Sequence, residues 1–323
     1  MKAIVCTKYG PPEVLQLREV EKPVPKKNEV LIKIRATSVT ASDCIIRSFK
    51  MPGNHSFPKK QVMELMMRLV VGFTRPKNPI LGLVLSGDIE STGNDITQFK
   101  KGDQVYGFTG YSFGAYAEYI CMSEKESTRG CFAIKPSNMN HEEAAAITYG
   151  GMLATHFMRS GNIQSGQKVL IYGASGAIGT AAVQLARCHG AEVTGVCSSK
   201  NFDLVKSLGA DKVIDYTEED SKKRLDAYDF VLDAVGKNKS SELKVECRKS
   251  LSHNGKYVSV DDGSLKLHSE YLVQLKEFVE AGNLKAVIDS RYPLEQMAEA
   301  HRYVDKGHKR GNVVITVVTN SKT

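Results

Sequence analysis

Three small residues follow an apolar run in the middle of the chain, and their spacing suits a phosphate-binding turn. The run KVLIY at 168–172 leads into Gly173-Ala-Ser-Gly-Ala-Ile-Gly179, where Ala174, Gly176 and Gly179 take the three glycine positions of a dinucleotide fingerprint. Glycine at 176 lets the backbone approach a pyrophosphate, and glycine at 179 permits close packing of a helix on the strand. The free N–H groups of that helix would bind negative charge. The alternative, a purely structural turn, does not explain the strands and helices that surround it.

The residues after the next strand indicate which dinucleotide is bound. In NAD-binding proteins an acidic residue about 20 positions further on binds the ribose 2′-OH. Here that strand ends in Ser198, Ser199 and Lys200, and the next carboxylate is Asp203. Two hydroxyls and an ammonium suit a 2′-phosphate. The sequence therefore predicts NADPH rather than NADH, and the alternative is that Lys200 only begins a surface helix.

Positioning these residues requires a parallel sheet. From about residue 141, apolar strands alternate with helices, which is typical of βαβ units and a doubly wound parallel sheet. Residues 1–122 instead form short β segments of alternating polarity, separated by proline and glycine turns, and GNVVITVV near the C-terminus forms another strand. We predict an α/β protein with a Rossmann domain and a mostly β, partly barrel-like domain.

Composition excludes several classes of protein. The chain has 323 residues, of which 41% are hydrophobic and 25% charged, as in an ordinary soluble protein of two domains. It has no apolar run of about 18 residues and begins without a signal-peptide core, so we expect no membrane span. Seven cysteines without a C-x-x-C pair favour a reducing compartment, and we expect a cytoplasmic protein. The net charge of +8 suits a phosphate-rich ligand or a solvated basic surface.

Motifs spread along the whole chain carry a family likeness. They are the opening MKAIVCTKYGPPEV, FKKGDQVYG at 99–107, FGAYAEY at 113–119, the fingerprint, LGADKVIDY at 208–216, FVLDAVG at 230–236 and YPLEQMAEAHRYVDKGHKRGNVVI at 292–315. With these motifs the chain resembles the medium-chain dehydrogenase/reductase superfamily, in its zinc-independent branch of quinone oxidoreductases and NADPH-dependent enone reductases. The resemblance implies a GroES-like catalytic domain formed by residues 1–122 and 265–323. The Rossmann dinucleotide-binding domain, residues 123–264, is inserted between these two pieces, with the active site in the cleft.

The resemblance also implies a set of cofactor-binding residues. Those expected at the pyrophosphate and at the 2′-phosphate belong to the first two strand ends: Gly173, Ser175, Gly176, Ala177, Ile178, Ser198, Ser199 and Lys200. Those expected at the adenosine and at the nicotinamide half come from later segments: Tyr216, Asp233, Ala234, Val235 and Asn312.

Zinc catalysis is not expected. The positions that hold metal ligands in zinc-dependent relatives fall on Thr40, Leu83 and Val84, and leucine and valine cannot ligate a metal. The reaction expected without a metal is hydride transfer to an acceptor that is already electrophilic, namely a quinone or an α,β-unsaturated carbonyl. Such a reaction needs a hydrogen-bond donor for the developing oxyanion. The resemblance offers Thr40, Ser42 and Tyr149 as candidate donors, with Thr148 as an alternative to Tyr149.

Two further expectations concern partners. The run 61–73 is rich in Met, Leu and Val, and its only charges, Glu64 and Arg68, share one helix face. It is too short to span a bilayer, and we expect it to bury its apolar face against a partner subunit, over an apolar pocket or in the core. The resemblance implies a homodimer. Because the chain is basic, an NADPH-binding sensor or RNA-binding protein with little activity is the alternative function, but the basic residues lack interleaved aromatics, so we expect no nucleic-acid partner.

Overall fold

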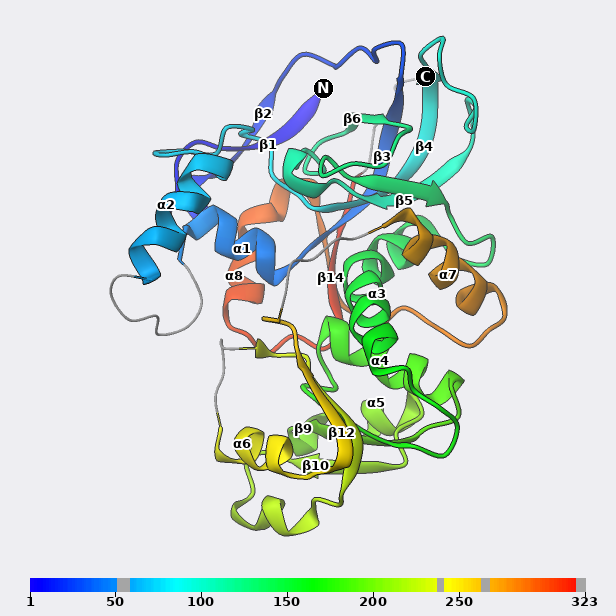
Figure 1. Cartoon of the computed structure of the whole chain (residues 1–323). Helices are drawn as coiled ribbons and strands as arrows, with labels where there is room; N and C mark the ends of the chain where they lie inside the picture. Colours follow the sequence, from blue (N-terminus) through cyan, green and yellow to red (C-terminus); the bar gives the residue numbers. More distant parts are fainter. Residues whose placement is uncertain (51–58, 237–240, 263–267, 318–323) are drawn as a thin grey trace.

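The computed structural model describes residues 1–50, 59–236, 241–262 and 268–317. Figure 1 shows two lobes, one built on a mixed sheet and one on a parallel sheet, with helix α3 (His141–Gly161) running from the first towards the second. Five short 3-10 helices complete the described connections: η1 (Pro12–Val14), η2 (Gly110–Ser112), η3 (Ser199–Asn201), η4 (Glu219–Arg224) and η6 (Leu294–Gln296).

The mixed sheet has seven strands. Its order is β13-β14-β3-β4-β5-β7, and β6 also pairs with β3. Both ends of the chain contribute, because β14 near the C-terminus pairs antiparallel with β3. The bounds are β3 (Glu29–Val39), β4 (Val84–Thr92), β5 (Gln104–Phe108), β6 (Tyr119–Ser123), β7 (Cys131–Ile134), β13 (Ile288–Pro293) and β14 (Asn312–Thr316), and a separate antiparallel pair is formed by β1 (Lys2–Cys6) and β2 (Leu15–Glu19). The mixed sheet thus extends beyond residue 122, through β7.

The second sheet has five parallel strands in the order β10-β9-β8-β11-β12. From β8 the chain builds outwards to β9 and β10 and then crosses to β11 and β12. The order therefore reverses between β8 and β11, and the carboxyl ends of these strands form the site at which such folds bind ligands. The bounds are β8 (Lys168–Tyr172), β9 (Glu192–Cys197), β10 (Lys212–Asp215), β11 (Tyr228–Asp233) and β12 (Leu251–Ser259). The predicted α/β fold class is confirmed.

Helices cover the sheets and connect the lobes. Besides α3 they are α1 (Ala41–Ser48), α2 (Lys59–Val71), α4 (Ala177–Cys188), α5 (Phe202–Ser207), α6 (Glu242–Lys249), α7 (Ser269–Glu280) and α8 (Met297–Asp305). A capping box between Asn140 and Glu143 starts α3 where the sequence predicts it. At the middle of α3, Tyr149 packs against the hydrophobic cores of both lobes. This helix is therefore the element that fixes the two lobes relative to each other.

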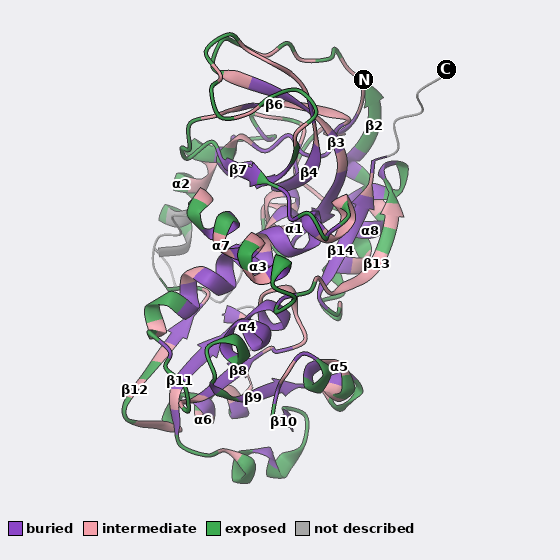
Figure 2. Cartoon of the chain, turned by 90° about the vertical axis from the view of Figure 1, so that its right-hand side faces the viewer, coloured by how far each residue is buried: buried purple, intermediate pink, exposed green. Residues whose placement is uncertain are grey.

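Helix α2 lies at the outside of the mixed-sheet lobe (Figure 1), and Figure 2 shows exposed residues along it. Six of its large apolar residues, and of those just after it, are exposed: Val62, Leu65, Met66, Leu69, Val70 and Phe73. The expectation that this run is an ordinary core helix is therefore wrong. In the described part of the chain, no helix is long and apolar enough to cross a bilayer.

Candidate functional site

The fingerprint turn joins β8 to α4. Gly173 takes a positive φ of 83°, and Gly176 is the extended N-cap of α4. A Cβ atom on Gly176 would meet only the Gly173 carbonyl, at 3.5 Å, and would otherwise point into open space. A Cβ atom on Gly179 would lie 2.1 Å from that carbonyl oxygen and 2.7 Å from Ala174 Cα. The turn thus has one glycine that keeps space open above the helix start and another that allows the helix to pack on the strand.

A buried asparagine connects this turn to the end of β9. Asn201 Nδ2 donates to Ser175 Oγ at 3.1 Å and to Ser198 Oγ at 3.2 Å. Asn201 is buried, and its Oδ1 has no hydrogen-bond partner among the described residues. A buried acceptor without a donor is costly, so Oδ1 suits a donor supplied by a ligand or by water. Asn201 is not among the residues predicted from the sequence, although it directly follows the Ser-Ser-Lys run.

Ser199 and Lys200 are exposed at the same corner, beside the end of β10. The Ser199 N–H donates to Asp215 Oδ2 at 2.6 Å, and Thr217 donates to Asp215 Oδ1 through its N–H and its hydroxyl. Burial opposes the charge of Asp215, but these hydrogen bonds outweigh it and lower the pKa of the carboxyl. Asp215 therefore holds the Ser199 turn in place, and the Lys200 ammonium is left at the surface for an anion.

The adenosine position predicted for Tyr216 is next to this corner. Tyr216 is partly exposed, and its ring centroid lies 6.5 Å from that of Tyr172, the last residue of β8. Tyr172 is itself fixed by a hydrogen bond of 2.7 Å between its hydroxyl and Ser241 Oγ. The structure thus places Tyr216 at the carboxyl end of the sheet, on the side of β9 and β10.

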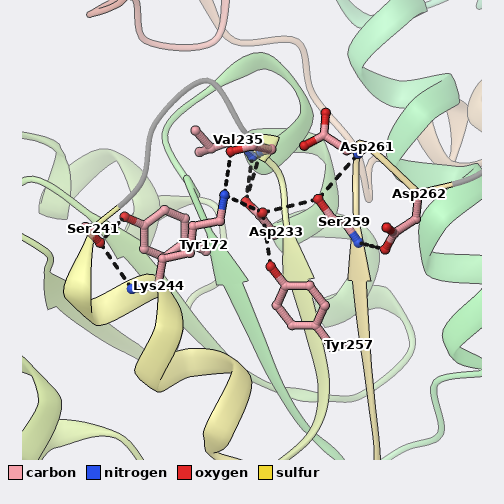
Figure 3. A network of polar contacts seen from close by, with 10 residues as sticks. Tyr172, Asp233, Val235, Ser241, Lys244, Tyr257, Ser259, Asp261 and Asp262 are labelled. Atoms are coloured by element: carbon pink, nitrogen blue, oxygen red, sulfur yellow. Dashed lines mark hydrogen bonds and ion pairs between the residues drawn. The ribbon is translucent and has the colours of Figure 1, made fainter. Parts of the chain in front are cut away.

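The carboxylate of Asp233 lies inside the fold at the end of β11 (Figure 3). Its Oδ1 accepts from the N–H groups of Val235 and Gly236, at 3.1 and 3.0 Å. Its Oδ2 receives Lys244 Nζ at 2.6 Å, the Tyr257 hydroxyl at 3.1 Å and Ser259 Oγ at 3.2 Å. Both oxygens are buried and engaged with protein donors. Asp233 therefore shapes the 234–236 loop, and Ala234 and Val235 are the residues that this loop can present to a ligand.

The C-terminal return reaches the fingerprint turn directly. The Gly311 N–H donates to the Ser175 carbonyl at 2.8 Å, and Gly311 forms a parallel bridge with Gly176. Asn312 is buried, and its Nδ2 donates to the Val287 carbonyl at 3.2 Å, so its side chain positions this return. The half-buried Lys309 lies beside it, and desolvation lowers the pKa of its ammonium to about 8.

Of the three candidate donors, the structure brings two together. Ser42 Oγ and the Tyr149 hydroxyl, from α1 and α3, are 3.0 Å apart. The Tyr149 ring stacks on Phe108 at 5.6 Å, and burial raises the pKa of its hydroxyl. Thr40 differs, because its hydroxyl donates to Asp43 Oδ2 at 2.6 Å and accepts from the Asp43 N–H as the N-cap of α1. The Thr40 hydroxyl is therefore committed to the capping box, whereas the Ser42 and Tyr149 hydroxyls are hydrogen-bonded to each other.

Behind the cap of α1 lies a buried polar cluster. His301 Nε2 is 3.1 Å from the Tyr116 hydroxyl, and its Nδ1 is 3.4 Å from Cys44 Sγ. Burial raises the pKa of Asp43 to about 6, against the hydrogen bonds from Thr40. Burial and the charge of Arg47 lower the pKa of His301 to about 3. At neutral pH the cluster therefore holds a neutral imidazole behind a carboxylate.

Asp43 and His301 give opposite contributions to the pH dependence of stability. Between its ordinary pKa of 3.8 and about 6, Asp43 binds its proton more tightly in the folded chain, so stability falls as pH rises. Between about 3 and its ordinary 6.5, His301 binds its proton more tightly in the unfolded chain, so stability rises with pH. From pH 4 to 6 the two slopes oppose each other in the wild type.

Removing one of the two groups is expected to reveal the slope of the other. Relative to the wild type, Asp43→Asn should lose about 1.4 kcal/mol of unfolding free energy per unit that pH drops from 6 to 4. His301→Gln should change by a similar amount in the opposite direction. Urea unfolding at pH 4, 5 and 6 measures both differences. Parallel pH profiles for the wild type and both variants would contradict the assignment.

The residues at the positions that hold zinc ligands in zinc-dependent relatives do not fit a zinc ion. Leu83 and Val84 are buried in the hydrophobic core, and the Thr40 hydroxyl is held by Asp43. Across the described ranges, no three or more His, Cys, Asp or Glu side chains come together in a group that could hold a metal.

Comparison with known proteins places the chain in a family. Residues 26–135 match the family model "Alcohol dehydrogenase GroES-like domain", and residues 208–315 match "Zinc-binding dehydrogenase". The mitochondrial NAD(P)H oxidoreductase RTN4IP1 of Mus musculus is 30% identical, over 98% of this chain and 89% of its own. The 2-methylene-furan-3-one reductase of Solanum lycopersicum is also 30% identical, over 98% and 79%.

Solved structures agree with the sequence comparison. The quinone oxidoreductase from Coxiella burnetii superposes with a TM-score of 0.82 at 28% identity, over 98% of this chain and 99% of its own. The two proteins thus share their overall fold over almost the whole of both chains. The chain therefore belongs to the medium-chain dehydrogenase/reductase superfamily and is an oxidoreductase of its quinone oxidoreductase-like branch.

Proposed function

We propose that the protein transfers hydride from NADPH to a quinone or an α,β-unsaturated carbonyl, without zinc. The observation that carries the proposal is the open space over Gly176 at the switch point of the parallel sheet. A dinucleotide pyrophosphate fits there, against the N–H groups that start α4. The names of two similar proteins, a quinone oxidoreductase and a 2-methylene-furan-3-one reductase, support the acceptor class.

The absence of fitting zinc ligands at Thr40, Leu83 and Val84 supports the same acceptor class. Bound NADPH would supply the hydride. A saturated ketone needs its oxygen polarised, commonly by a metal, whereas a quinone or an enone is already electrophilic. The chain's part is then to hold the acceptor in the cleft, to exclude water and to donate hydrogen bonds to the oxygen that gains charge.

The Ser42–Tyr149 pair suits this donor role. A hydroxyl acts as an oxyanion donor only while it keeps its proton, and burial raises the pKa of Tyr149, so it stays protonated at neutral pH. Ser42 Oγ, at 3.0 Å, can relay a proton to or from Tyr149. The pair joins α1 of the mixed-sheet lobe to α3, the helix that packs on both lobes.

A screen of acceptors tests the proposed reaction. Purified protein with NADPH is expected to oxidise the cofactor in the presence of quinones or enones and not with saturated ketones of matched size. Cofactor absorbance measures the rate, and one product per NADPH establishes the stoichiometry. Absence of turnover with every quinone and enone would contradict the proposal.

Loss of the Tyr149 hydroxyl is expected to slow the reaction. We expect Tyr149→Phe to lower kcat roughly 100-fold, as for removal of one oxyanion donor, and to leave the Kd for NADPH unchanged. Tyr111→Phe is the control, because Tyr111 is a largely exposed tyrosine of the nearby η2 segment. Steady-state kinetics with one enone compares the two variants. A wild-type kcat in Tyr149→Phe would assign the donor to another group.

Lys200 is expected to set the preference for NADPH. Its exposed ammonium at the end of β9 suits a 2′-phosphate, and a charge-assisted contact corresponds to about tenfold in affinity. Lys200→Ala should therefore remove most of a preference of at least about tenfold over NADH. Lys206→Ala, an exposed lysine of the neighbouring α5, is the control. Calorimetric titration with both cofactors measures the ratio, and equal affinities in the wild type would contradict the proposal.

Two further expectations, on the oligomeric state and on the cellular compartment, belong to this proposal. A homodimer is supported by β12, because this edge strand of the parallel sheet has no strand partner on its outer side among the described strands. Light scattering after gel filtration tests it. A reducing compartment such as the cytoplasm is supported by all seven cysteines being free, and fractionation of the source cells tests it.

A further inference from the structure

The outer side of α2 has the reverse of the usual arrangement. Amphipathic helices of a folded domain turn the apolar face to the core and the charged face to solvent. In α2 the inner face carries Glu64 and Arg68 beside Met67 and Val71, and the latter two pack in the hydrophobic core of the mixed-sheet lobe. The solvent face is apolar, and its six large residues are between 52% and 63% exposed: Val62, Leu65, Met66, Leu69, Val70 and Phe73. We call these six residues the α2 face.

The α2 face is held in place by contacts at its C-terminal end. The Tyr9 hydroxyl donates to the Gly72 carbonyl at 2.9 Å, and the Lys77 N–H donates to the Val71 carbonyl at 2.7 Å. The Arg68 guanidinium lies 4.5 Å from the ring centroid of Phe49, the residue that ends α1. The apolar side chains are therefore presented outwards by a fixed helix end, on the lobe that carries Ser42.

The charge around the α2 face is positive. Arg75 and Lys77 are exposed directly after the helix, and Arg68 is half-buried beside it. Between residues 61 and 77 the only acid is Glu64, on the inner side, and the whole chain carries a net charge of +8. An apolar stripe bordered by cations is complementary to a membrane surface with anionic headgroups, into which such a helix sinks about 5–10 Å.

Size argues against a second copy of the chain as the occupant. A stable protein–protein interface takes about 20–30 residues from each side. The α2 face has six residues on one helix, and its border of like charges would meet the same border on a partner. A bilayer needs neither a large matching area nor a complementary shape.

We propose that the α2 face docks the protein on the surface of an anionic lipid bilayer, with α2 lying in the interface. The proposal does not depend on the reaction. It would bring the lobe that carries Ser42 close to apolar acceptors that partition into lipid.

A single tryptophan reports on this docking, because the chain contains none. Met66→Trp places the reporter in the centre of the α2 face, and Val273→Trp places it at an exposed apolar position on α7. Vesicles of phosphatidylcholine with phosphatidylglycerol should shift the emission of Met66→Trp to the blue and leave that of Val273→Trp unchanged. No shift with Met66→Trp, or an equal shift with phosphatidylcholine alone, would overturn the proposal.

Flotation with the same vesicles gives an independent measure. Leu65→Ser with Leu69→Ser is expected to lower the partition coefficient at least tenfold, because both side chains leave the bilayer interface. The matched control, Val245→Ser with Val273→Ser, removes two exposed apolar side chains elsewhere and should bind as the wild type does. The rate of NADPH oxidation with a water-soluble acceptor should be the same in the wild type and in both double variants, which separates docking from the reaction. Equal flotation of the two double variants would overturn the proposal. The proposal would also fail if the wild type did not bind vesicles and instead formed a dimer that only the Leu65→Ser with Leu69→Ser variant lost.

Discussion

Replacing Gly176 by valine is expected to abolish NADPH binding, with a loss of at least 100-fold in affinity, and to leave the fold intact. The backbone of Gly176 is extended, with φ −82° and ψ 177°, so a β-branched residue takes it without strain. Its side chain would enter the open space above the start of α4, where a Cβ atom meets only the Gly173 carbonyl, at 3.5 Å. That is the space a pyrophosphate needs. Calorimetric titration measures the affinity, and thermal unfolding without cofactor shows that the chain still folds.

Gly179 provides the matched contrast within the same turn. A Cβ atom there would lie 2.1 Å from the Gly173 carbonyl oxygen, a backbone atom that cannot move aside cheaply. Gly179→Ala is therefore expected to cost about 3 kcal/mol of unfolding free energy, at the upper end for overpacking. The two variants thus separate binding from packing. Retained NADPH affinity in Gly176→Val would place the pyrophosphate elsewhere, and an unchanged stability in Gly179→Ala would contradict the packing role.

Local sequence patterns were sufficient for the scaffold of this site. The alternation of apolar runs and helices predicted the parallel sheet, and the glycine spacing predicted the turn between β8 and α4. These features depend on residues near each other in sequence. The Thr40 capping box could also have been predicted, since Thr-x-x-Asp before an amphipathic segment is a capping signal, but Thr40 was interpreted only as a zinc-ligand position of relatives and as a candidate donor.

Other features depend on contacts between distant segments and could not be predicted. Asn201 bonds to Ser175 across two strand ends, and His301 meets Tyr116 and Cys44 from three separate parts of the chain. Periodicity predicted a helix at 61–73 but could not tell which face turns outwards. That depends on the few contacts at its end, which bury Val71 and leave the larger apolar face in solvent.

Asp233→Ala is expected to cost about 3–5 kcal/mol of unfolding free energy, the largest loss of stability that we predict. Asp233 and Lys244 form an ion pair of 2.6 Å with side chains 2% and 15% exposed, and four further residues donate to the same carboxylate. Removing one partner of a buried pair leaves a charge and several donors without their acceptor, which costs far more than the pair contributes net. Glu242→Ala is the control, on the same helix as Lys244. The side chains of Glu242 and its partner Lys222 are 80% and 52% exposed, so this pair should contribute less than about 1 kcal/mol.

A double-mutant cycle separates the pair from its surroundings. Lys244→Met removes the charge and keeps most of the apolar stem, and alone it should also destabilise, because Asp233 then lacks its cation. The combined Asp233→Ala and Lys244→Met variant should lose at least about 1 kcal/mol less than the two single losses added, because neither charge is left unpaired. Urea unfolding of the four proteins measures the cycle. Strict additivity would mean that Asp233 acts through the loop donors alone. A coupled result would show that Asp233 acts in part through its pair with Lys244. Because Asp233 also accepts from the N–H groups of Val235 and Gly236, Asp233→Ala should also weaken NADPH binding, while Glu242→Ala should not.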